Sequence, residues 1–223
     1  MAAEFEVHKN VPLDASPEEV WEAIATGPGL EAWFMPMELD PESALVLAWL
    51  PGKRLAVRTP ESDSGSSQAF EYLIEARDGG STVLRFAHSL AGDDWNDEFV
   101  SMASRGWDMY FHTLTQYFTH FRGRSATYIE AEGPNSSALQ QNWPRLLDAV
   151  DATTLHGSVR LTLPGRPPTA GTVDYVSENF LGGALPMPSS AFTAGGRSAS
   201  WLGSQDARAW THGAAGSHRR DAS

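Results

Sequence analysis

The sequence of 223 residues contains no cysteine. A disulfide framework and a thiolate-ligated metal site are therefore excluded, and a reducing cytoplasm is the natural setting for such a chain. The start, MAAEFEVHKN, carries charges and no apolar core, so no signal peptide is visible. No uninterrupted apolar run reaches the ~18 residues of a membrane span. We expect a soluble, cytoplasmic protein that does not insert into a membrane.

Basic residues are also scarce. The chain has 16 Lys and Arg against 28 Asp and Glu, for a formal net charge of −12. This surplus of negative charge repels phosphate groups, which argues against nucleic acids and anionic membranes as partners. Residues 1–125 hold 20 acidic and 9 basic residues, so the N-terminal part carries nearly all of the net charge.

Familiar catalytic and metal-binding motifs are absent as well. The chain contains no GxSxG, HExxH, Walker A or EF-hand pattern. Residues 27–32 formally fit GxGxxA, but they follow a predicted helix rather than a strand and include a proline, so we reject a dinucleotide site. His112 and His120 lie about 80° apart around one predicted helix, too far round and along it to share a metal ion. We predict no cofactor and no metal site.

The residues that are present in the first part of the chain predict strands and two short helices. Apolar side chains alternate over residues 5–13, as in a strand with one buried face. The segment SPEE at 16–19 is a capping box with proline at the first helical position. We expect GPG at 27–29 to end this helix, and LEAWF at 30–34 to form a further helical turn.

A meander of four strands is expected next. ALVLAW at 44–49 and RLAVRT at 54–59 flank a Pro-Gly turn. FEYLIEA at 70–76 and TVLRFAHSL at 82–90 alternate in hydrophobicity and flank an Asp-Gly-Gly hairpin turn. Together with the preceding elements, these strands predict an antiparallel sheet.

A long helical pattern begins near Trp95 and ends the first part of the chain. At 100° per residue, Met109 and His112 point away from its apolar stripe. The order of strand, two short helices, meander and long helix is that of an α+β helix-grip fold, in which a curved antiparallel sheet wraps around the last helix. The stripe consists of Val100, Ala103, Trp107, Phe111, Leu114, Phe118 and Phe121, with Phe99, Tyr110 and Tyr117 along its edge.

Three segments of this part, VPLDASPEEVWEAIATGPGLEAWF, AWLPGKRLAV and GWDMYFHTL, closely resemble the START-like superfamily (SRPBCC, Bet v-type helix-grip proteins). Within it they resemble the bacterial branch of homologues of a chaperone-ATPase activator. The resemblance covers residues 5–122 and implies the helix-grip fold for a domain of residues 1–125. It does not imply one function, because members bind lipids, polyketides, hormones or partner proteins, and some catalyse cyclisation.

Residues 126–182 are expected to form a small α+β extension, as in some members of that branch. TYIEAE at 127–132, SVRLTL at 158–163 and TVDYVSENFLG at 172–182 predict strands. LQQNWPRLLDAV at 139–150 predicts a short helix with Pro144 in its first turns.

Residues 183–223 contain no Lys, Glu, Val, Ile or Tyr and consist largely of Ala, Gly, Ser and Arg. This composition is typical of a disordered tail. A second hypothesis rests on the resemblance: relatives with this extension continue after FLG with a pattern like DALFRFHGR. Codons chosen for residues 186–197 spell that pattern in a shifted frame, so a frameshift from about Gly183 would explain the change of character.

The main functional signal is the set of aromatic residues on elements that should line the grip. A curled sheet over one helix commonly leaves a cavity, and an apolar pocket with few polar groups suits a hydrophobic ligand. His88 shares a strand face with Leu84 and Leu90, and is either a core histidine bonded to a backbone carbonyl, a polar anchor for a ligand, or a weak acid/base. The candidate ligand-binding residues are Trp33, Trp49, Tyr72, Phe86, His88, Trp107, Tyr110 and Phe111.

Three functions remain open. The predicted pocket holds no convincing carboxylate pair or nucleophile–base pair, which argues against an enzyme. The first hypothesis is therefore non-catalytic binding of a small apolar or amphipathic ligand. The second is an enzyme of the polyketide aromatase/cyclase type, in which His88 or a tyrosine assists proton transfer. The third follows from the resemblance: a protein-interaction module that regulates a chaperone or stress-response partner through the outer face of the sheet.

Overall fold

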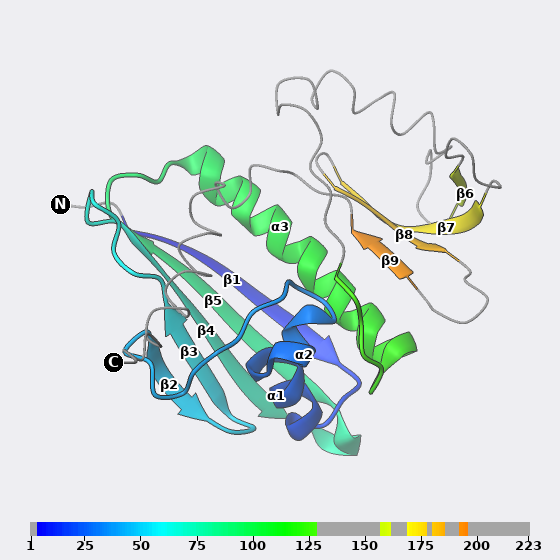
Figure 1. Cartoon of the computed structure of the whole chain (residues 1–223), viewed down its shortest axis with the longest axis horizontal. Coiled ribbons are helices and arrows are strands. Elements are labelled where there is room, and N and C mark those ends of the chain that lie inside the picture. Colours follow the sequence, from blue (N-terminus) through cyan, green and yellow to red (C-terminus); the bar gives the residue numbers. More distant parts are fainter. Residues whose placement is uncertain (1–3, 129–156, 162–168, 178–179, 186–191, 196–223) are drawn as a thin grey trace, which may run out of the picture. The chain divides into compact units, whose positions relative to one another are not determined.

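The computed structural model describes residues 4–128, 157–161, 169–177, 180–185 and 192–195. The chain divides into two units near Tyr128, and each is described by itself. In the first unit a strand, two short helices, four strands and a long helix follow one another (Figure 1). This unit has the α+β helix-grip fold that the sequence predicts.

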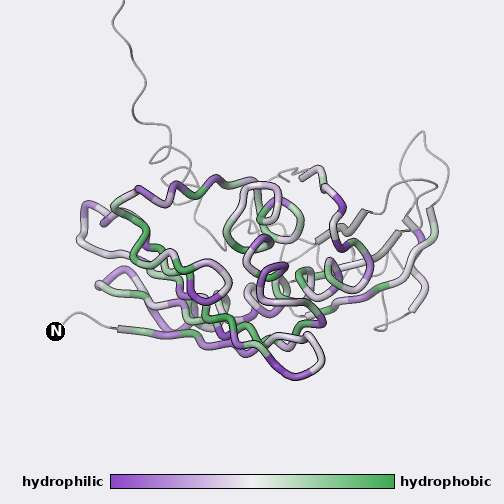
Figure 2. Tube along the Cα trace, turned by 90° about the horizontal axis from the view of Figure 1, so that it is seen from below, coloured by the Kyte–Doolittle hydropathy of each residue, from purple (hydrophilic) through white to green (hydrophobic). Residues whose placement is uncertain are grey.

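A five-stranded antiparallel sheet is the main layer of the first unit, in the order β1-β5-β4-β3-β2. Burial alternates along β4 and β5, so one face of the sheet is buried, and Figure 2 shows the same alternation in hydropathy along the strands. We call the face covered by the helices the inner face and the opposite one the outer face. The strands are β1 (Glu4–Leu13), β2 (Val46–Leu50), β3 (Arg54–Arg58), β4 (Ser67–Ala76) and β5 (Thr82–Ala91).

The two short helices, α1 (Pro17–Ala25) and α2 (Gly27–Glu31), follow each other almost without a break. The capping box is confirmed: the amide of Glu19 donates to the Ser16 hydroxyl at 3.3 Å, and the Glu19 carboxylate accepts from the Ser16 amide at 2.8 Å. The first helix ends at Ala25, just before GPG, as expected, but GPG is itself the start of α2, whereas the sequence predicts the further helical turn only from Leu30. Proline is favoured in a first helical turn, and the Thr26 hydroxyl caps α2 by accepting from the Gly29 amide at 3.1 Å.

Gly29 also allows α2 to lie close to α1. A Cβ atom at this position would lie 2.1 Å from the carbonyl oxygen of Glu22 and 2.8 Å from the Cα of Ala23. These are backbone atoms of α1, which cannot move aside as a flexible side chain can. The close approach of the two helices therefore requires glycine here.

The long helix α3 (Asp97–Gln116) begins at the N-cap Asn96 and continues into a π-helical turn, Tyr117–Phe121. The predicted stripe is confirmed in its middle, since Ala103, Trp107, Phe111, Leu114 and Phe118 are buried, whereas its end residues Val100 and Phe121 are half-buried. The expected outward position of Met109 is wrong: this side chain is 7% exposed. A single apolar stripe therefore underestimates how much of α3 is buried.

The second unit contains a four-stranded antiparallel sheet in the order β6-β7-β8-β9. The single strand expected at 172–182 is two strands, because the chain turns where the amide of Ser177 donates to the carbonyl of Phe180 at 2.8 Å. Serine, which stands at position 177, is a typical turn residue. The strands are β6 (Ser158–Leu161), β7 (Thr169–Val176), β8 (Leu181–Leu185) and β9 (Phe192–Gly195).

Strands β8 and β9 extend beyond Gly182, where the composition predicts a disordered tail. Gly182 pairs with Gly195, and Ala184 with Thr193. Sheet pairing uses backbone groups that every composition supplies, so a shortage of apolar side chains does not by itself prevent it. The helix expected at 139–150 and most of the strand expected at 127–132 lie outside the described residues, as do residues 196–223.

Candidate functional site

A continuous group of aromatic rings fills the space between the inner face of the sheet and α3. Its centre is Phe86 of β5, whose ring centroid lies 4.2 Å from that of Trp107, 5.1 Å from Phe111 and 5.0 Å from Tyr72. Aromatic rings at these distances are in direct contact. We call this group the aromatic cluster; it consists of Trp33, Phe34, Phe70, Tyr72, Phe86, Trp107, Tyr110 and Phe111.

The cluster joins residues from parts of the sequence that are far apart. Sheet register places Tyr72 of β4 opposite Phe86 of β5, so both rings project from the inner face. Trp107 and Phe111 are one turn apart on α3, with ring centroids 5.4 Å apart. The chain after α2 adds Trp33, whose centroid is 5.8 Å from Phe111.

Phe34 also belongs to this cluster. It does not lie in a segment with a helical or strand-like repeat of apolar residues, so the sequence pattern does not identify it. Its ring lies 5.5 Å from that of Trp107 and 4.6 Å from that of Tyr110. Phe70 is a second addition, 5.9 Å from Trp107. The alternation FEYLIEA could have identified Phe70, because it shares a face with Tyr72.

Trp49 is the one predicted aromatic residue that lies apart from the aromatic cluster. It projects from the edge strand β2 and packs edge-on against Trp21 of α1, with ring centroids 5.2 Å apart. Both tryptophans are half-buried. The structure therefore separates the predicted binding residues into a central cluster and a lateral tryptophan pair.

His88 is a buried polar group of this region, with 1% of its surface exposed and its ring stacked on Phe70. The indole Nε1 of Trp107 donates to His88 Nδ1 at 3.1 Å, and His88 Nε2 lies 2.9 Å from Gln68 Oε1. An indole N–H can only donate, so Nδ1 must be the unprotonated acceptor. The proton is then on Nε2, which donates to Gln68.

The surroundings of His88 and Tyr72 oppose proton transfer near neutral pH. Burial lowers the pKa of His88 to about 3, so the imidazole is neutral, and both of its nitrogens are already hydrogen-bonded. Burial also raises the pKa of the Tyr72 phenol above its ordinary value. His88 is a core histidine, as one of the sequence interpretations holds, but its partners are side chains rather than a backbone carbonyl.

Two rings of the aromatic cluster, Phe34 and Tyr110, are only half-buried and form its boundary with the surface. Deeper in the cluster, Trp33 is 3% exposed and its indole donates to the carbonyl of Ala23 at 2.9 Å. The chain after Phe34, residues 35–45, contains turns but no helix or strand and leads to β2 (Figure 1). Phe34 is therefore held by α3 on one side and continues into an irregular segment on the other.

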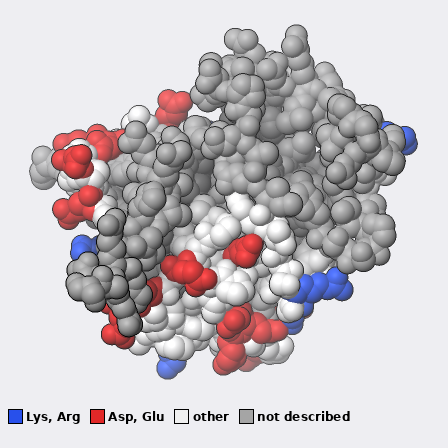
Figure 3. Space-filling model, in the orientation of Figure 1, with Lys and Arg blue, Asp and Glu red and all other residues white. Residues whose placement is uncertain are grey.

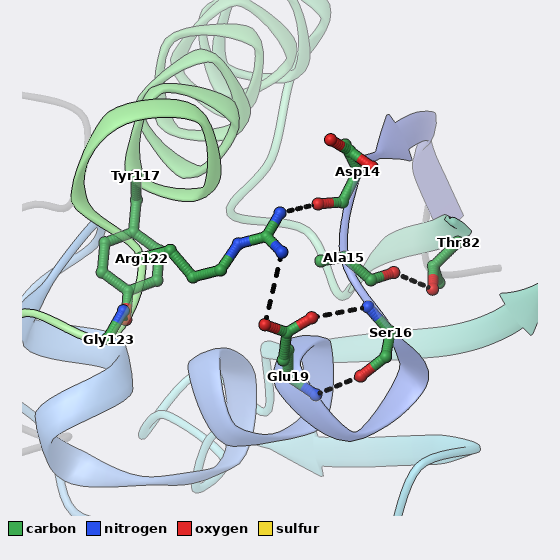
Figure 4. A network of polar contacts seen from close by, with 8 residues as sticks. All are labelled: Asp14, Ala15, Ser16, Glu19, Thr82, Tyr117, Arg122 and Gly123. Carbon is green, nitrogen blue, oxygen red and sulfur yellow. Dashed lines mark hydrogen bonds and ion pairs between the residues drawn. The ribbon is translucent and has the colours of Figure 1, made fainter. Parts of the chain in front are cut away.

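Polar contacts hold α3 at two points beside the aromatic cluster. The ammonium of Lys9 on β1 lies 2.6 Å from Asp108 and 2.9 Å from the Ser104 hydroxyl, both on α3. Beyond the π-helical turn, Arg122 donates to the carbonyl of Asp14 and lies 3.4 Å from the Glu19 carboxylate of the capping box (Figure 4). These contacts fix both the middle and the end of α3 against the first strand and helix.

The surface around the described first unit is acidic. In Figure 3 the acidic side chains outnumber the basic ones on the face in view. Among the described residues, no three His, Cys, Asp or Glu side chains gather closely enough to hold a metal ion. In the same part of the chain, no helix has the length and hydropathy needed to cross a membrane.

Neither the profiles of known families nor the curated protein sequences give a match. The structure is similar to the Aha1 dimer of Colwellia psychrerythraea, at 18% identity, with 53% of this chain and 99% of that chain covered and a TM-score of 0.40. It is also similar to an AHSA1-like protein of Rhizobium etli, at 21% identity, with 59% of this chain and 96% of that chain covered and a TM-score of 0.41.

A third similar structure is DynU16, a protein of the dynemicin biosynthetic locus. Its identity is 16%, with 85% of this chain and 79% of that chain covered and a TM-score of 0.43. At this identity the likeness concerns the fold, and conclusions about function must rest on the residues of the site itself.

Proposed function

We propose that the protein binds a small apolar or amphipathic ligand, without catalysing a reaction, at the end of the aromatic cluster where Phe34 and Tyr110 reach the surface. The observation that supports this most is the half-burial of these two rings beside otherwise buried ones. Phe34 lies on an irregular segment, so it can be displaced at lower cost than a ring on a strand or helix. A ligand that replaced it would contact Trp107 and Tyr110.

The state of His88 favours binding over catalysis. A general acid or base works best with a pKa near the working pH and with a free position toward the substrate. His88 has a pKa of about 3 and no free ring nitrogen. A cyclase-type mechanism through His88 or Tyr72 therefore has little support among the described residues.

The charge of the chain narrows the ligand class. Residues 1–125 carry 20 acidic and 9 basic residues. On α3, the charged residues nearest in sequence to Tyr110 are Asp108 and Arg105. One is acidic and one is basic, so they do not form a basic patch. The negative field disfavours an anionic ligand such as a fatty-acid carboxylate. The ligand we propose is neutral or cationic, with a ring or chain that packs on aromatic surfaces.

Native mass spectrometry of the full chain purified from its own host tests the proposal directly. We expect an adduct of small-molecule mass that denaturation releases. Titration with N-phenyl-1-naphthylamine, a neutral fluorescent probe, should show stronger binding than titration with the anionic anilinonaphthalene sulfonate. A clean unliganded mass together with no binding of the neutral probe would contradict the proposal.

Two variants locate the site. Tyr110→Ala should weaken binding of the neutral probe by about tenfold, because the ligand that replaces Phe34 loses one aromatic contact and its buried area. Trp49→Phe is the matched control, because Trp49 is also half-buried and aromatic but lies in the lateral tryptophan pair. Equal losses in the two variants would show that the probe does not bind at the Phe34 end of the cluster.

A further inference from the structure

We propose that residues 35–45 form a movable cover over the Phe34 end of the aromatic cluster, and that a ligand enters when this cover lifts. We call these residues the strap. The inference rests on the proposed function, because it concerns access to the same site. Figure 1 shows the strap crossing the sheet between α2 and β2, on the side that carries the helices. It begins directly after Phe34, one of the two rings that form the boundary of the cluster with the surface.

The two ends of the strap are anchored by backbone hydrogen bonds. The Phe34 amide donates to the Leu30 carbonyl of α2 at 2.8 Å, and the Arg58 amide of β3 donates to the Leu45 carbonyl at 2.8 Å. Between these anchors, among the described residues, no hydrogen bond joins residues 35–39 to a helix or strand. A segment with so few contacts opens locally at low free-energy cost. The strap can therefore lift in its middle while both ends stay in place.

The side chains of the strap alternate between the protein and the solvent. Met35, Met37 and Leu39 are half-buried, and the residues between them are exposed. An extended chain presents alternate residues to opposite sides, so the strap turns an apolar side toward the protein without pairing as a strand. Methionine side chains are flexible and fit apolar surfaces of varied shape. The same side of the strap can therefore pack on the empty site or on a bound apolar ligand.

Glu38 makes a contact between the strap and α2. Its carboxyl group lies on Gly27, where a Cβ atom would be 2.1 Å from Glu38 Oε1 and 2.6 Å from its Cδ. Glycine therefore leaves the space that this carboxyl group occupies, and Gly27 is buried although Glu38 is exposed. Because water also reaches the carboxylate, little free energy of solvation changes when Glu38 leaves Gly27. The contact can close the strap and still release it.

The charge of the strap fits the proposed ligand class. Its charged residues are Glu38, Asp40 and Glu42, all exposed, and it contains no Lys or Arg. An anionic ligand would meet this negative charge before it reached the cluster. A neutral or cationic ligand would not be repelled.

Stopped-flow mixing with N-phenyl-1-naphthylamine tests the strap through the rate of probe association. Glu38→Ala removes the contact with Gly27, and Gly27→Ala places a methyl group where the carboxyl group lies. We expect both variants to bind the probe about fivefold faster than the wild type, because the lifted state is populated more often. Glu42→Ala is the matched control, since it removes the same charge from an exposed position of the strap but leaves the Glu38 contact in place. It should bind at the wild-type rate.

An introduced cross-link tests the opposite effect. The chain has no cysteine, so Gly27→Cys combined with Glu38→Cys allows one intramolecular disulfide. Oxidation should hold the strap closed and slow association of the probe by about tenfold, and reduction should restore the rate. Glu38→Cys alone, treated with the same oxidant, is the control and should show no slowing. Thermal unfolding of each variant checks that it is folded.

Three results would overturn the inference. They are equal association rates in Glu38→Ala and Glu42→Ala, a cysteine pair that forms no disulfide, and an oxidised pair that binds the probe as fast as the reduced one. In each case, binding of the probe by the wild type would leave the proposed function intact. A wild type that binds no neutral probe would instead contradict the proposed function and the strap together.

Discussion

The two faces of the five-stranded sheet share one backbone but differ in chemistry. On the inner face, Tyr72 and Phe86 are neighbours in register and join the aromatic cluster. On the outer face the charged residues form ion pairs: Arg54 lies 2.6 Å from Glu71, and Arg85 lies 2.7 Å from Glu75. The stability that buried rings provide depends on how closely their shapes fit together. Partly exposed ion pairs contribute little to the free energy of unfolding, because water and salt screen them. The inner face should therefore tolerate substitution much less well than the outer face.

The largest effect is expected at the centre of the aromatic cluster. Trp107→Ala should lower the free energy of unfolding by about 4 kcal/mol, through the lost ring and the unsatisfied His88 nitrogen. Urea denaturation monitored by circular dichroism measures this change. The matched outer-face variant, Arg85→Ala, should cost less than about 1 kcal/mol. Similar losses for the two variants would contradict the contrast between the faces.

The second largest effect is expected at Gly29, where α2 lies close against α1 over the inner face. Gly29→Ala should destabilise the protein by about 3 kcal/mol, because the new methyl group would lie against α1 backbone. Gly27→Ala is the control, since its methyl group would meet only the flexible end of the Glu38 side chain. Thermal unfolding of both variants measures the two effects. If the Gly27 variant were as unstable as the Gly29 variant, the close contact of Gly29 with the α1 backbone would not be the cause of the destabilisation.

The buried histidine makes the stability of the inner face depend on pH. The folded pKa of His88 is about 3 and its ordinary value is 6.5, so below pH 6.5 the unfolded chain binds a proton that the folded chain does not. Above pH 6.5 this difference in proton binding costs the folded chain no stability. As the pH falls from 6.5 toward 3, the free energy of unfolding declines by about 1.4 kcal/mol per pH unit.

His88→Gln removes this titration while keeping a hydrogen-bonding side chain. Between pH 6.5 and pH 5, the wild type should lose about 2 kcal/mol more stability than the variant. Urea denaturation at each pH measures the difference in the free energy of unfolding between wild type and variant. The other titratable groups contribute equally to both chains, so their contributions cancel in this difference. Parallel stability profiles would show that His88 is not held in its neutral form.

The smallest effect is expected for a single ion pair of the outer face. A double-mutant cycle with Arg54→Ala and Glu71→Ala should give a coupling energy below about 1 kcal/mol, because both side chains are more than a third exposed. The coupling should shrink further in high salt. A coupling as large as the loss in Trp107→Ala would remove the distinction between the two faces.

The order of elements in the first unit could be predicted because its signals are local. The capping box at Ser16–Glu19, the alternation in β4 and β5, and the stripe on α3 each involve residues close in sequence. Strand and helix periods depend on the same short-range geometry. The aromatic cluster could be predicted in part, since Tyr72, Phe86, Trp107 and Phe111 all lie on faces that these periods identify.

Other features depended on which distant segments meet. Phe34 joins the cluster because the chain after α2 returns to α3, and no local pattern marks that contact. Trp49 lies apart because β2 is the edge strand. Met109 is buried although the helical period points it away from the stripe. Each outcome depends on the packing partners of an element, which sequence periodicity does not contain.

The sequence by itself determined the α+β class, the elements of the helix-grip unit and the acidic charge, because composition, turns, caps and hydrophobic period are properties of neighbouring residues. The tertiary structure decided the chemistry of the site. Only packing reveals that His88 is bonded to Gln68 and Trp107 rather than free to transfer protons, and that Phe34 and Tyr110 form the exposed end of the cluster. The physical reason is that burial and hydrogen-bond partners are set by segments far apart in the chain.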